Sequence, residues 1–156
     1  MLYVMCMDGR RTESPASPQV VLPDGWPRPR GYAQALRVPA GRELVFVAGQ
    51  IGWDETERLV SGDFPVQFER ALQNCVTVVR AAGGDARDIV RFTMYCTDRN
   101  AYLMNRRLVG EAYRRVMGEH YPAMSLVEVS ALIEAGALIE IEATAAVPPA
   151  DTGRKA

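Results

Sequence analysis

Residues 121–148 constrain the fold more than any other part of the chain. They read YPAMSLVEVSALIEAGALIEIEATAAVP, two runs of alternating residues separated by the link EAGA at 134–137. Alternation with a period of two is typical of β-strands, and a short glycine-containing link between two such runs predicts a β-hairpin. We therefore expect two adjacent strands in this segment.

The alternation also assigns side chains to faces, because successive side chains of a strand point to opposite sides. In the first run Met124, Leu126 and Glu128 share one face, and in the second run Glu140 and Glu142 share one. Two carboxylates at this spacing repel each other, so their face usually meets water, a partner or a binding site. A solvated face is the default interpretation of the two glutamates.

The composition favours one globular domain. The chain has 156 residues, of which 48% are hydrophobic and 24% charged, and its net charge of −1 gives no general attraction to nucleic acid or anionic membranes. Cys6, Cys75 and Cys96 are far apart and predict reduced thiols in a cytoplasmic protein. The single histidine, His120, excludes a metal site that needs two imidazoles. No apolar run approaches the roughly 18 residues of a membrane span.

The remaining segments predict a mixed fold. Residues 1–30 are rich in proline, serine, arginine and glycine, so we expect an extended N-terminal segment with little regular structure. Residues 32–38 and 44–48 predict two strands joined by a hairpin turn. A helix over 64–82, a strand over 88–97 and a helix over 99–117 follow, with Asp63 and Asp98 as expected helix caps.

The predicted order is therefore β-β-α-β-α-β-β, an α+β fold with both helices on one face of a mixed sheet. The opposite face of the sheet then has no cover within the chain. We expect Met124, Leu126 and Leu132 to lie on that uncovered face, and an apolar uncovered face indicates self-association.

Six segments, in register along the chain, carry a family resemblance: GYAQAL, LVFVAGQIG, QFERALQNCVTVVRAAGG, DIVRFTMYCTD, YPAMSLVEVSAL and LIEIEATA. Together they resemble the Rid family of reactive-intermediate deaminases, also called the YjgF family and historically labelled endoribonuclease L-PSP. The resemblance covers residues 31–148, so we expect a Rid-type domain there, preceded by the segment 1–30 and followed by a tail at 149–156. It implies a chorismate-mutase-like fold and a homotrimer with ligand clefts between subunits. It also implies hydrolysis of small enamines or imines to a carbonyl compound and ammonia, without metal or organic cofactor.

The resemblance implies a site as well. Tyr32 corresponds to the family's tyrosine at the start of the first strand, a pocket wall and phenol donor. Glu140 corresponds to the glutamate that positions the attacking water and accepts its proton. Met124 stands where the family's deaminases have an arginine that clamps the substrate carboxylate, and Leu126 replaces a common cysteine. The thioether of methionine cannot form the bidentate, charge-assisted pair that an arginine forms with a carboxylate. Loss of that pair weakens binding of a 2-imino acid by about one to two orders of magnitude.

Three functions remain open. The first is a deaminase whose substrate lacks the usual carboxylate or presents it to another arginine, such as Arg30 or Arg91. The second is a non-catalytic trimer that binds an apolar or aromatic metabolite, for which Met124 is an adaptable wall. The third, an endoribonuclease, is disfavoured because the arginine pairs at 106–107 and 114–115 are typical of a solvated helix face, and no basic strand is interleaved with aromatic residues. His120 could shuttle protons, although a lone histidine at a helix-to-strand junction is typically a surface or capping residue.

Overall fold

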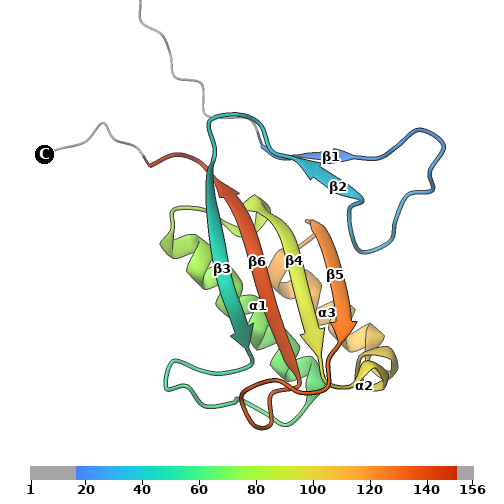
Figure 1. Cartoon of the computed structure of the whole chain (residues 1–156), viewed down its shortest axis with the longest axis vertical. Coiled ribbons are helices and arrows are strands. Elements are labelled where there is room, and N and C mark those ends of the chain that lie inside the picture. Colours follow the sequence, from blue (N-terminus) through green and yellow to red (C-terminus); the bar gives the residue numbers. More distant parts are fainter. Residues whose placement is uncertain (1–16, 151–156) are drawn as a thin grey trace, which may run out of the picture.

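A four-stranded mixed sheet, in the order β3-β6-β4-β5, forms the centre of the fold (Figure 1). The structure is a computed structural model that describes residues 17–150, so the prediction for Cys6 lies outside the described residues. The strands of the sheet are β3 (Glu43–Ile51), β4 (Ile89–Cys96), β5 (Ala123–Glu128) and β6 (Ile139–Val147). β6 pairs antiparallel with both β3 and β4, whereas β5 pairs parallel with β4.

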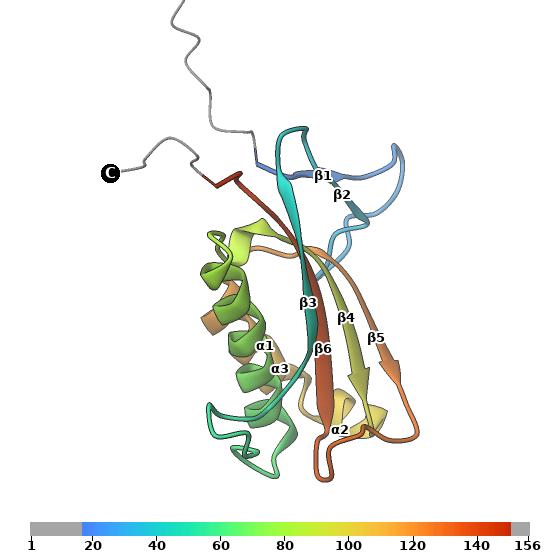
Figure 2. The same ribbon diagram turned by 60° about the vertical axis from the view of Figure 1, so that its left-hand side comes forward.

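The helices cover one face of this sheet. Figure 2 shows α1 (Phe64–Ala81) and α3 (Arg106–Met117) side by side against the sheet, with the short α2 (Arg99–Met104) at its end. The described part of the chain leaves the opposite face bare. The predicted α+β fold, with both main helices on one face of a mixed sheet, is confirmed. We call the face against the helices the covered face and the opposite one the bare face.

The hydrophobic core lies between the covered face and the two main helices, α1 and α3. The apolar stripe of α1 is buried, and it packs with the alternate residues of β6, Ile139 and Ile141, which are 0% exposed. Full burial of such side chains stabilises the fold by roughly 1.5–3 kcal/mol each. Cys75 and Cys96 are buried and free, as their apolar neighbours predicted.

The prediction of a hairpin over 121–148 is wrong. β5 and β6 are strands, but β6 lies between β3 and β4, and β5 occupies the edge next to β4. The intervening loop is held to α1 by the buried Gln67 instead of turning directly back. The Gln67 amide donates to Gly136 O at 2.9 Å and its Oε1 accepts from Leu138 N at 2.8 Å. Alternation therefore identified both strands, whereas tertiary hydrogen bonds decided their neighbours.

The prediction of a hairpin between residues 32–38 and 44–48 is also wrong. β2 (Ala35–Arg37) pairs with β1 (Gln19–Val21) in a separate two-stranded sheet, so β1 lies in the segment expected to have little regular structure. The start of β3 is fixed elsewhere, because the buried Arg42 guanidinium donates to Asp88 Oδ1 at 2.7 Å and to the backbone oxygen of Ala146 at 2.5 Å. These bonds connect the residue before β3 to β6 and to the residue before β4.

The helix predicted over 99–117 is divided at Asn105, whose side chain donates to Ala101 O at 2.8 Å. Asp98 caps α2 as predicted, accepting from Asn100 N at 2.7 Å. Asp63 does precede α1, but its side chain makes no capping hydrogen bond.

The assignment of Met124, Leu126 and Leu132 to the bare face is wrong. Met124 pairs with Phe92 and Leu126 with Met94, and both β4 partners are buried under the helices. Leu132 lies in the loop after β5. The bare face instead carries Phe46, which is 77% exposed. The error arises from pairing β5 with the wrong strand, because the pairing partner decides which face of an edge strand is covered.

Candidate functional site

A cleft of about 540 Å³ opens between α3, β5 and residues 30–32. Met124 and Leu126 form its β5 wall, and Tyr32 lies at its exposed side. The structure thus brings together all three residues that the sequence assigned to substrate binding. Met124 and Leu126 are only half-buried because β5 is the edge strand and extends beyond the cover of the helices.

Local backbone geometry holds Tyr32 beside β5. Ala33 N donates to Pro122 O at 3.0 Å, and Ala33 forms a parallel bridge with Ala123. Gly31 has φ of 82°, a left-handed conformation that glycine adopts without steric cost. These contacts fix the N-terminal segment as one side of the cleft.

An aromatic pair forms another part of the cleft. The rings of Tyr113 and Tyr121 stack with centroids 5.2 Å apart, and the Tyr113 hydroxyl donates to His120 O at 2.8 Å. Burial raises the pKa of Tyr113, so its hydroxyl remains a neutral donor. His120 Nε2 lies 2.7 Å from Ile89 O, so the imidazole joins the α3–β5 junction to the start of β4.

Among residues 17–150, three arginines line the cleft, and no aspartate or glutamate does so. They are Arg30 from the N-terminal segment and Arg106 and Arg114 from α3. Arg91 lies in an adjacent hollow of about 300 Å³, together with Tyr32 and Met124. Both arginines that the sequence proposed as substitutes for the family's clamp, Arg30 and Arg91, therefore lie near Met124.

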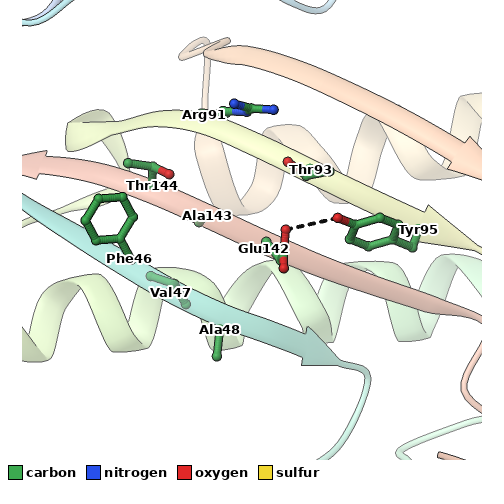
Figure 3. A pocket seen from close by; sticks show the side chains of 9 residues that line it. All are labelled: Phe46, Val47, Ala48, Arg91, Thr93, Tyr95, Glu142, Ala143 and Thr144. Carbon is green, nitrogen blue, oxygen red and sulfur yellow. Dashed lines mark hydrogen bonds between the residues drawn. The ribbon is translucent and has the colours of Figure 1, made fainter. Parts of the chain in front are cut away.

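A second hollow, of about 530 Å³, lies on the bare face (Figure 3). Figure 3 shows Tyr95 of β4 pointing toward Glu142 of β6, and its hydroxyl donates to Glu142 Oε2 at 3.1 Å. This hydrogen bond, with the nearby Glu142 and Glu140 charges, raises the pKa of Tyr95. The phenol therefore stays protonated and keeps the Glu142 carboxylate in place.

Glu140 lies on the bare face, next to a bulge in β3. It pairs with Ile51 of β3, and the pairing shifts register between Val47 and Gln50. A Cβ added to Gly49 would come within 1.8 Å of Glu140 Oε1. The half-buried carboxylate thus rests against a backbone position that only glycine leaves free. Glu140 and Glu142 share the bare face, as the alternation predicted.

Within one copy of the chain, Glu140 is separated from the cleft. In the sheet, Glu140 pairs with Tyr95, and Tyr95 pairs with Val127 of β5. Val127 is three residues from Met124, roughly 10 Å along the strand, and its side chain lies on the other face. The carboxylate and the three substrate-binding candidates therefore do not form one site in a single copy.

The sequence did not identify Arg106 and Arg114 as cleft residues. Their exposure was predicted, but residues four apart on a helix share a face, and this face of α3 meets the cleft. A usable signal was the spacing Arg106, Gly110, Arg114, which places a glycine between two cations in a helix interior.

None of the helices within residues 17–150 is long and apolar enough to cross a membrane. The same residues contain no group of three or more histidine, cysteine, aspartate or glutamate side chains placed to hold a metal ion.

Comparisons with known proteins give a consistent result. The family model described as Endoribonuclease L-PSP matches residues 27–147. A RutC family protein of Pyrococcus abyssi is 37% identical over 129 residues, covering 81% of this chain and 95% of the relative. A 2-iminobutanoate/2-iminopropanoate deaminase of Homo sapiens is 34% identical over 122 residues, covering 78% of this chain and 83% of the relative. The crystal structure of YyfB, a Rid family protein of unknown function from Yersinia pestis, superposes with a TM-score of 0.74 at 28% identity, covering 85% of this chain and 100% of YyfB.

Proposed function

Because the chain belongs to the Endoribonuclease L-PSP family, we propose that it hydrolyses small enamines and imines to a carbonyl compound and ammonia, with a non-standard substrate preference. The observation that carries the proposal is the gathering of Tyr32, Met124 and Leu126 in one cleft, with a glutamate presented on the bare sheet face. The name of the human relative, a 2-iminobutanoate/2-iminopropanoate deaminase, supports the reaction class.

The proposal includes a homotrimer, because Glu140 cannot reach the cleft of its own copy. The bare face exposes Leu44 and Phe46, which are 55% and 77% exposed. An apolar surface of this kind is stabilised by covering it with another copy. In the proposed assembly, Glu140 from one copy faces a ligand beside Met124 of a neighbouring copy.

The proposed reaction needs only water and the carboxylate. Glu140 orients a water molecule and accepts one of its protons while the water oxygen bonds to the imine carbon. The C=N electron pair moves to nitrogen, which takes the proton from Glu140 to give a carbinolamine. Solvent water then protonates the nitrogen, Glu140 accepts the hydroxyl proton and returns it to solvent, and cleavage of the C–N bond releases ammonia and leaves the carbonyl compound.

The non-standard preference follows from the wall beside the substrate. The side chains of Met124 and Leu126 have no hydrogen-bond donor, so this part of β5 cannot bind a carboxylate through them. A substrate must either lack the carboxylate or direct it to a guanidinium elsewhere around the cleft, where Arg30 and Arg91 lie. We therefore expect aromatic or branched imines to be hydrolysed faster than 2-iminopropanoate.

The test is hydrolysis of imines generated in situ, 2-imino acids by an amino-acid oxidase and carboxylate-free imines by an amine oxidase, with semicarbazide trapping of the remaining imine. We expect the protein to release ammonia faster than buffer alone, and Glu140→Gln to lower the rate by about 10²–10⁴-fold. Glu142→Gln is the matched control, since this residue lies two positions away on the same face. Its carboxylate is hydrogen-bonded to Tyr95, so we expect a rate within a few-fold of the unmodified protein.

Two outcomes contradict the proposal. The first is no acceleration with any aliphatic, aromatic or carboxylate-free imine in the panel. The second is a monomer by sedimentation analysis, because a single copy leaves Glu140 away from the cleft. Ligand binding without turnover in an intact trimer would instead establish the non-catalytic binding function.

A further inference from the structure

α3 contains two pairs of adjacent arginines, at 106–107 and 114–115, and in each pair only one arginine has a carboxylate partner among the described residues. Arg107 donates to Glu111 Oε1 at 2.5 Å, and Arg115 makes a bidentate pair with Glu69 at 2.6 and 2.9 Å. Their neighbours Arg106 and Arg114 make no ion pair with any residue of 17–150, and both line the cleft. The second member of each pair thus has a carboxylate, and the first faces the cleft without one.

The helix backbone supports this arrangement. Arg106, Gly110 and Arg114 are spaced by four residues and lie on one face of α3. A glycine in a helix interior costs about 1 kcal/mol relative to alanine. A Cβ at Gly110 would lie 3.7 Å from Arg114 Nη1, so the guanidinium folds back over the glycine beside the cleft. Gly110 lines the same cleft and lowers the helix surface between the two cations.

The cleft combines positive charge with an apolar interior. Arg106 and Arg114 lie on the α3 wall, whereas Met124 and Leu126 form the β5 wall. Tyr102 and Tyr121 add aromatic surface. Because the described residues place no acidic side chain in the lining to compensate the arginines, the α3 wall attracts an anion. Guanidinium groups bind planar anions such as carboxylates through paired hydrogen bonds.

We propose that Arg106 and Arg114 form the anion-binding wall of this cleft, and that its ligands carry a carboxylate or phosphate group on an apolar or aromatic body. The anionic group lies toward α3 and the apolar body lies over Met124 and Leu126. This inference rests on the proposed function in one respect, that the cleft is where the substrate binds. It assigns the recognition of substrate charge to α3, across the cleft from β5.

The test uses benzoate as an anionic aromatic probe and benzamide as its neutral counterpart of the same shape. Binding is measured by isothermal titration calorimetry and by changes in the NMR chemical shifts of the backbone amides. We expect benzoate to bind at least about tenfold more tightly than benzamide, because a hydrogen bond to a charged group contributes roughly 1.5–3 kcal/mol. The shifts should concentrate on α3 and β5.

Variants identify the residues that contribute. Arg106→Gln with Arg114→Gln should lower benzoate affinity about tenfold or more and leave benzamide affinity unchanged. Arg107→Gln is the matched control, since its exposed pair with Glu111 is on the same helix but away from the cleft lining. Each single variant is also measured, so that poor folding of the double variant does not decide the result.

Equal affinities for benzoate and benzamide, undetectable benzoate binding, or full benzoate affinity in Arg106→Gln and in Arg114→Gln would each overturn the inference. Its failure is distinguishable from failure of the deaminase proposal. Intact imine hydrolysis with benzoate binding that is insensitive to these substitutions rejects only the anion-binding wall. Arginine-dependent benzoate binding with no ammonia release rejects only the proposed reaction.

Discussion

The two faces of the central sheet are built from the same strands but have opposite chemistry. On the covered face, Phe92, Ile139 and Ile141 are 0% exposed and lie under the helices. On the bare face, the same strands carry Tyr95, Glu142 and the half-buried Glu140. One set of alternate positions thus stabilises the fold, whereas the other carries two carboxylates and, on β3, the exposed ring of Phe46.

The edge strand β5 does not follow this division into a buried face and an exposed face. Met124 and Leu126 are on the covered face, yet they are half-buried and line a cleft with α3. The cleft lies where the helix cover ends, whereas the bare face carries Glu140, Glu142 and the exposed Phe46. Under the proposed function, the first region binds the ligand and the second provides the assembly contacts and the carboxylate that activates water. Five substitutions and one control test this division, from the largest expected effect to the smallest.

Phe92→Ala should lower the free energy of unfolding by about 3–5 kcal/mol, because it opens a cavity in the fully packed covered face. Phe92 is 0% exposed and is among the largest buried side chains. Urea denaturation followed by circular dichroism measures the change. A loss below about 1 kcal/mol would mean that the covered face is not the main source of stability.

Gly49 and Gly52 are three residues apart but should respond differently to alanine. At Gly52 a Cβ would lie 2.6 Å from the Cα of Gln67, a backbone atom that cannot move aside, so stability should fall by about 1–3 kcal/mol. At Gly49 the obstacle is the flexible end of Glu140. Gly49→Ala should therefore preserve the fold and lower imine hydrolysis by about 10–100-fold.

Gly62→Ala is the control for both variants, because no heavy atom lies within 4 Å of a Cβ at that position. Thermal unfolding and the ammonia-release assay measure the two effects separately. Full activity in Gly49→Ala would show that the position of the Glu140 carboxylate does not limit the reaction.

Phe46→Ser should leave the fold intact and weaken self-association. The ring is 77% exposed on the bare face, so its removal creates no cavity within one copy. Sedimentation velocity over a concentration series should show the oligomer dissociating at higher protein concentration than the unmodified chain. An unchanged oligomer would mean that the bare face is not the contact surface.

Glu69→Gln should have the smallest effect, since it alters an ion pair on the outer side of the helices. The hydrogen bond from Arg115 holds the pKa of Glu69 below its usual value. A lowered folded-state pKa contributes stability that is present above the unfolded pKa and lost as pH falls through the folded one. Replacement by glutamine should therefore flatten the decline in stability below about pH 5. An unchanged pH profile would show that this pair contributes nothing measurable.

The sequence predicted which residues of one strand share a face better than it predicted which strands are neighbours. The period of two correctly placed Glu140 and Glu142 together, because the geometry of one strand decides this. It could not predict that β6 lies between β3 and β4, since the loop before β6 is positioned by Gln67, about 70 residues earlier in the chain. Local patterns do not contain such long-range contacts.

The same limit applies to the candidate site. The family resemblance selected Tyr32, Met124 and Leu126, and these gather in one cleft. Arg106 and Arg114 were assigned to a solvated face because helical periodicity shows which residues lie together but not what they face. The cleft combines segments around residues 30, 110 and 125, and their approach depends on the parallel pairing of β4 and β5.

The central position of β6 also affects how the protein is synthesised. β6 pairs with β3 and β4, and one of these contacts joins Glu43 to Val147. Until residues 139–147 leave the ribosome, β3 and β4 have no common neighbour, and both expose unpaired backbone edges that favour aggregation. The nascent chain therefore depends on its final strand, so a ribosome that pauses before this segment would leave an incomplete sheet in need of chaperones.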